Sequence, residues 1–147
     1  MKRFRFKLET VLKVKYRVEE LRQRELLVAQ NLREQAHREL LQRRQAASET
    51  AAAYRENLRK RLDLQLILYF QRFLTWRNEQ VDLAVHLLAE SEFRVEAARQ
   101  RLIVATQERK IIEKLKERAY QSYLAAELSE EIKFLDEIGT GRYVRQK

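Results

Sequence analysis

Most side chains of this chain that could do chemistry are charged, because cysteine is absent and only two histidines occur. His37 and His86 stand far apart in the sequence and are expected to lie on solvated helix faces. The carboxylates Glu130 and Glu131 are adjacent, so a helix would point them in divergent directions, which does not suit general acid–base catalysis. The segment 139–142 lacks the third glycine of a dinucleotide-binding loop and follows a predicted helix. We therefore expect no enzyme, no cofactor and no metal site.

Positive charge is the strongest chemical feature of the sequence. The net charge is +9, and residues 1–17 carry +6 while residues 99–118 carry +4. Such basic zones predict a docking surface for an acidic partner, which could be a protein, a phospholipid or a nucleic acid. The side chains expected to form this surface are Arg3, Arg5, Lys13, Lys114 and Arg118.

Aromatic residues predict a second contact surface. They lie within the apolar run from Leu62 to Trp76, which charged and amide side chains interrupt too often for a membrane span. Two paired helices would bury Phe70 and Leu74 between them but could not bury every large side chain of this run. The residues expected to remain available for a partner are Tyr69, Phe73 and Trp76.

The elements that carry these surfaces are predicted to be long helices. Proline is absent, and the only glycines are Gly139 and Gly141. Apolar residues recur at coiled-coil spacing in two frames. The first contains Val11, Val14, Val18, Leu21, Glu25, Val28 and Leu32, apolar except for Glu25, and then shifts phase toward Leu62. The second contains Ile67, Phe70, Leu74, Arg77, Val81, Ala84, Leu88, Ser91, Val95, Ala98, Leu102, Ala105, Arg109 and Ile112, and helical spacing continues to Ile138.

The two frames predict an all-α fold, a long two-helix antiparallel coiled-coil hairpin that forms one domain and is monomeric. We expect helices over about 3–60 and 64–138, a reversal over about 57–66, and a basic tail over 139–147. A turn near Arg77–Asn78 is the alternative position for the reversal. Asp63 is the expected N-cap of the second helix, and Gly139 is its expected C-cap. The reversal would place Val11 opposite Glu113 and both basic zones at the same end.

Three stretches of the sequence follow a recognisable pattern in order. Phe4-Arg5-Phe6-Lys7-Leu8-Glu9-Thr10-Val11-Leu12 is similar to Phe-x-Phe-x-Leu-x-x-Val-Leu, the opening pattern of the flagellar FliJ family. Residues 108–117 (ERKIIEKLKE) and 135–138 (LDEI), the latter just before the basic tail, are similar as well. Residues 129–133 (SEEIK) depart from the family's pattern, which affects contacts expected from that turn of helix.

The resemblance implies a stalk protein of the flagellar type III export apparatus. Its implied partners are the hexameric export ATPase, whose ring the basic end would enter, the cytoplasmic domain of the export gate, and export chaperones. It also implies a cytoplasmic location, with peripheral association at the cytoplasmic face of the cell membrane and no nucleic-acid partner. The residues by themselves leave open an alternative, a nucleic-acid-binding or structural coiled coil.

Overall fold

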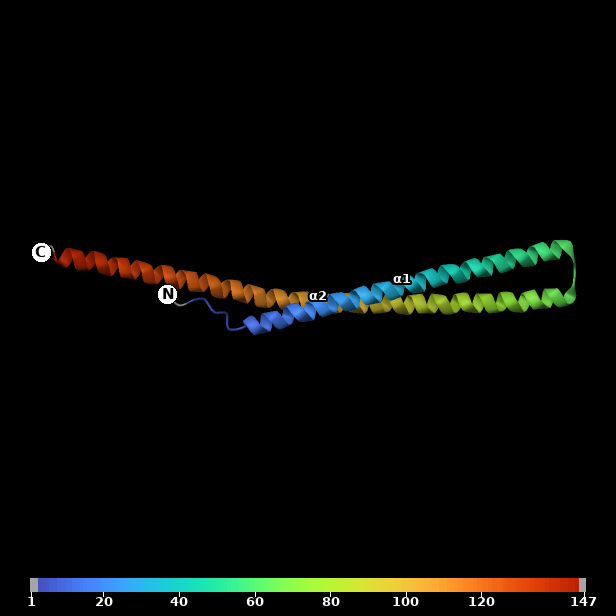
Figure 1. Ribbon diagram of the computed structural model, residues 1–147, viewed down its shortest axis with the longest axis horizontal. Coiled ribbons are helices and arrows are strands. Elements are labelled where there is room, and N and C mark those ends of the chain that lie inside the picture. Colours follow the sequence, from blue (N-terminus) through green and yellow to red (C-terminus); the bar gives the residue numbers. More distant parts are fainter. Residues whose placement is uncertain (1–2, 146–147) are drawn as a thin grey trace. The chain divides into compact units, whose positions relative to one another are not determined.

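The computed structural model describes residues 3–145, which form two helices and no strand. Helix α1 comprises Glu9–Lys60 and helix α2 comprises Leu64–Arg145 (Figure 1). The chain divides into two compact units. Unit 1 contains Met1–Glu20 and Ile103–Lys147, and unit 2 contains Leu21–Leu102. The predicted all-α helical hairpin is confirmed, whereas the organisation as a single domain stays a prediction.

The reversal lies within unit 2 and falls inside the predicted range. Residues 61–63 connect the helices, and the backbone N–H of Gln65 donates a 3.0 Å hydrogen bond to the Asp63 carboxylate. This bond satisfies one of the first amides of α2, which have no partner within the helix. Asp63 is therefore the N-cap that the sequence predicted.

Each unit contains an antiparallel pair of helical segments. In unit 1, Glu9 pairs with Lys116 and Glu19 with Thr106, so ten residues forward along α1 correspond to ten residues back along α2. In unit 2, Arg43 donates to the carbonyl of Gln80, and the ring of Tyr54 packs on Phe70. These pairs follow the register predicted from a reversal near Leu62.

The predicted frame of α2 is confirmed by burial. Ala84, Ser91, Val95, Ala98 and Ala105 are all less than a tenth exposed. Four of them are alanine or serine, which lets the opposing helix approach closely. The Ser91 hydroxyl donates to the carbonyl of Leu88, so its burial leaves no polar group unpaired.

The predicted frame of α1 is wrong between residues 11 and 32. Val14, Leu21 and Val28 are 50–58% exposed. The side chains that lie between the two helices, which we call the seam, are one position later along α1. In unit 1 they are Leu12, Lys15 and Glu19, and in unit 2 they are Arg22, Leu26 and Ala29. The reason is that Lys15 and Glu19 find charged partners on α2, which counting apolar residues does not register.

Both predicted outer ends of the helices need correction. Residues 3–6 are not helical and α1 begins at Glu9; the segment before it continues along α2, where the Phe4 ring packs on the Tyr120 ring. Helix α2 does not end at Gly139 but continues to Arg145, so the predicted 139–147 tail is helical as far as the structure describes it. No described glycine has a positive φ, so the αL cap is absent. The hydroxyl of Thr140 donates to two carbonyls of the preceding turn instead.

Candidate protein-binding surfaces

The N-terminal segment of unit 1 presents basic side chains from an aromatic anchor. The Phe4 ring lies 5.2 Å from the Tyr120 ring and 5.5 Å from the Tyr123 ring, measured between centroids. This anchor fixes the segment although it has no helical hydrogen bonds of its own. Arg3 and Arg5 on either side of Phe4 are exposed and line shallow grooves next to α2.

The other predicted docking residues lie in the same unit. Lys13 is exposed on α1, and Lys114 and Arg118 are exposed on α2, where their spacing of four residues puts them on one face. The ion pair between Glu9 on α1 and Lys116 on α2, 2.8 Å long, fixes the register of the two helices in this unit. The structure therefore brings the five residues into one unit, and their role in binding stays a prediction.

A polar network, which was not predicted from the sequence, joins the two helices of unit 1. Arg109 pairs with Glu19 on α1 and, at 2.6 Å, with Glu113 one turn further along α2. Tyr16 donates a hydrogen bond to Glu113, and the Thr106 hydroxyl donates to Glu19 at 2.8 Å. The available signal was Arg109 itself, a charged residue at a position of a mostly apolar frame.

This network shifts the pKa values of its members. The hydrogen bond donated by Tyr16 holds the pKa of Glu113 below its usual range, and Arg109 acts in the same direction. The same bond raises the pKa of Tyr16, because it stabilises the protonated phenol beside a carboxylate. At neutral pH, Glu113 is therefore ionised and Tyr16 is neutral, which is the state in which the bond forms.

In unit 2, the predicted aromatic residues stack along one face of α2. The ring centroids of Tyr69 and Phe73 are 6.1 Å apart, and those of Phe73 and Trp76 are 5.7 Å apart with an interplanar angle of 8°. Spacings of three and four residues create this ladder, since they place side chains on one side of a helix. Tyr69 and Trp76 remain 60% and 45% exposed, so the ladder offers aromatic surface to a partner.

Arg77 completes the ladder and was not predicted as part of it. Its guanidinium carbon lies 4.7 Å from the Phe73 centroid and 5.1 Å from the Trp76 centroid. Cation–π attraction of this kind holds the rings and the arginine together. The sequence signal was again a charged residue in the seam frame, because the frame of α2 passes through position 77.

Within residues 3–145, no group of three or more histidine, aspartate or glutamate residues could hold a metal ion. Neither helix, as far as it is described, has a stretch long and apolar enough to cross a membrane.

Comparisons with known proteins agree with the fold. The family model described as flagellar FliJ protein matches residues 4–147. The solved structure of CT670 from Chlamydia trachomatis, described as a YscO homologue, matches with a TM-score of 0.75. It shares 20% sequence identity, and the match covers 99% of each chain. No sequence among curated proteins matches the chain.

Proposed function

Because the chain belongs to the FliJ family and is thus a component of the flagellar type III export apparatus, we propose that its unit 1 docks into the export ATPase ring. The observation that supports the proposal is that Arg3, Arg5, Lys13, Lys114 and Arg118 share that unit and are all exposed. A ring bore lined with carboxylates would attract this surface. The protein itself carries out no reaction in this proposal and needs no cofactor.

Docking would stimulate the ATPase by linkage. A protein that binds the assembled hexamer more tightly than free subunits shifts the equilibrium toward the hexamer. The stalk would therefore promote assembly and ATP hydrolysis. It would act in the cytoplasm, at the cytoplasmic face of the cell membrane, as a peripheral component.

Charge reversal tests the docking surface. The triple variant Lys13→Glu, Lys114→Glu and Arg118→Glu should lose most ATPase stimulation, most clearly at low salt, because exposed charges are screened over about 8 Å at physiological ionic strength. The measurement is phosphate release by the purified cognate ATPase at graded concentrations of the variant. The matched control reverses Arg44, Arg55 and Arg59, which are exposed in unit 2. Equal losses in both variants would contradict the proposal, as would no loss in either.

The aromatic ladder would serve a second partner of the apparatus. We propose that Tyr69, Phe73 and Trp76 contact the cytoplasmic domain of the export gate or an export chaperone. The variant Tyr69→Ala/Trp76→Ala removes the two most exposed rings of the ladder. It should lose binding to these purified partners by calorimetry while stimulating the ATPase normally. Normal binding to both partners would refute this assignment.

Binding to nucleic acid is the outcome that would favour the alternative function. The proposal predicts that a fluorescent DNA duplex binds only at low salt. The triple variant in unit 1 and the control variant in unit 2 should weaken this DNA binding equally. Tight binding at physiological salt that is lost in the triple variant, without any ATPase stimulation by the wild type, would replace the export function by a nucleic-acid-binding one.

A further inference from the structure

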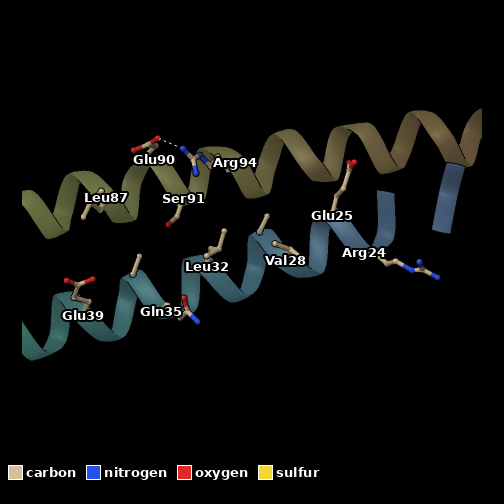
Figure 2. A pocket seen from close by; sticks show the side chains of 12 residues that line it. Arg24, Glu25, Val28, Leu32, Gln35, Glu39, Leu87, Glu90, Ser91 and Arg94 are labelled. Atoms are coloured by element: carbon tan, nitrogen blue, oxygen red, sulfur yellow. Dashed lines mark hydrogen bonds and ion pairs between the residues drawn. The ribbon is translucent and has the colours of Figure 1, made fainter. Parts of the chain in front are cut away.

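A groove lies between α1 and α2 within unit 2 and shares no residue with the two surfaces described above. Its volume is about 600 Å³, and it extends along α1 from Arg24 to Glu39 (Figure 2). Val28 and Leu32 line it from α1, and Leu87 lines it from α2. Their exposed fractions are 58%, 47% and 42%, which is high for branched apolar side chains of paired helices.

The groove exists because the seam of α1 is rotated from its most apolar stripe. Leu21, Val28 and Leu32 recur at spacings of seven and four, which is the spacing of a coiled-coil contact. Small residues lie deeper in the groove, namely Ala29 and Ala36 on α1 and the buried Ser91 on α2. The apolar side chains of α1, Leu87 of α2 and the small side chains between them form a seat for a third helix of a bundle.

The charges around the groove indicate what kind of helix fits. Each of its three carboxylates already has an arginine partner: Glu25 pairs with Arg22, Glu39 with Arg43 and Glu90 with Arg94. Arg24 is the lining charge that makes no ion pair or hydrogen bond within residues 3–145. The rim therefore has an uncompensated positive charge at the Arg24 end.

We propose that this groove binds an amphipathic helix of a partner protein, with an acidic side chain placed against Arg24. Residues 24–39 of α1 would span about 22 Å at 1.5 Å per residue, which corresponds to roughly four turns of the bound helix. The bound helix would present apolar side chains at spacings of three and four to Val28, Leu32 and Leu87. This site goes beyond the proposed function, since it uses neither the basic surface of unit 1 nor the aromatic ladder.

Photocrosslinking in the cells that produce the protein tests the site with the full chain. The photoreactive amino acid p-benzoylphenylalanine replaces Val28 in one variant and Leu87 in another, and adducts are mapped by mass spectrometry. Both variants should capture the same peptide of one partner, with apolar residues at helical spacing and an aspartate or glutamate. The control position is Gln30, an exposed residue of α1 that does not line the groove. It should give no such adduct.

The charge requirement is tested in the same assay. Arg24→Glu should lower the adduct yield at Val28 about fivefold, in line with loss of one surface ion pair. Arg33→Glu changes an exposed arginine of α1 outside the groove and should leave the yield unchanged. The proposal is overturned by adducts to a second copy of this chain, to lipid or to a peptide without the helical pattern. Absence of any adduct, or equal yields at Val28 and Gln30, would also overturn it.

Discussion

The two units hold the same pair of helices together by different means. In unit 2 the seam consists mainly of small and apolar side chains, among them Leu40, Ala84 and Val95, each at most 5% exposed. In unit 1 the seam contains the ion pairs of Lys15, Glu19 and Arg109 as well as apolar Leu12 and Ala105. Burial of apolar area gives unit 2 its stability, whereas unit 1 depends on oriented charges that stabilise less but fix partners in register.

The difference matters for function because unit 1 carries the proposed docking surface. A polar seam costs stability when one partner is lost, and it responds to pH and to nearby charge. An apolar seam responds to neither and supports a rigid scaffold. We therefore expect the helices to separate more readily in unit 1 than in unit 2, and the following changes test that expectation.

The largest effect should come from a charge placed in the seam of unit 2. Val95→Asp buries a carboxylate at a site that is 5% exposed and has no cation next to it in the seam frame. The expected loss is about 3 kcal/mol or more, which is a large part of the stability of a small domain. Thermal unfolding followed by circular dichroism measures it. Phe93→Asp, at a position 77% exposed on the same helix, should unfold like the wild type.

The next largest effect should come from removing the ion pair in the seam of unit 1, which tests whether apolar side chains can replace it. Arg109→Leu leaves Glu19 without its cation, so hydrogen exchange of residues 9–20 and 103–116 should accelerate while unit 2 is unchanged. Adding Glu19→Leu should restore protection to the wild-type level or above, because two apolar side chains can replace an ion pair without loss. If the double variant exchanged faster than the single one, the ion pair would be essential rather than replaceable.

A smaller effect should appear on acidification. The pKa of Glu113 is lowered in the folded state, so its contribution to stability is complete above its unfolded pKa of about 4.3 and is lost as the pH falls through the lowered value. Wild type should therefore melt at a higher temperature than Glu113→Gln at pH 7, and this difference should narrow progressively as the pH falls below about 4. A gap that stayed constant down to pH 2 would mean that Glu113 contributes through packing and not through its charge.

Much of the fold could be predicted because helix periodicity and N-capping are local properties. The frame of α2 and the cap at Asp63 depend on residues that are close in sequence, and both are confirmed. The frame of α1 failed because its apolar stripe and its seam differ by one residue. Partners on another helix decide between the two, as Glu19 and Arg109 show. Such pairing over nearly a hundred residues is not visible in local spacing.

The candidate surfaces were predictable to a similar degree. Stacking of Tyr69, Phe73 and Trp76 follows from their helical spacing, and charge counts alone identify the basic stretches. The positions of Arg77 over two rings and of Tyr16 on Glu113 were not predictable, since each needs side-chain geometry. The groove in unit 2 was missed for the same reason as the α1 frame, because it exists only when Val28 and Leu32 face outward.

The smallest effect concerns the end of α2 in unit 1, where neither kind of seam operates. Residues 128–143 are all exposed, so this stretch is held in helical form by local propensity and capping interactions and not by a partner helix. Gly139→Ala/Gly141→Ala should stabilise it locally by about 1 kcal/mol per site, because a Cβ at either position meets no atom within 4 Å and no φ is positive. Hydrogen exchange of residues 136–145 should slow, while the midpoint of global unfolding stays at its wild-type value. A raised midpoint would show that this end of α2 unfolds together with the paired helices, and the contrast between paired and unpaired segments of unit 1 would then fail.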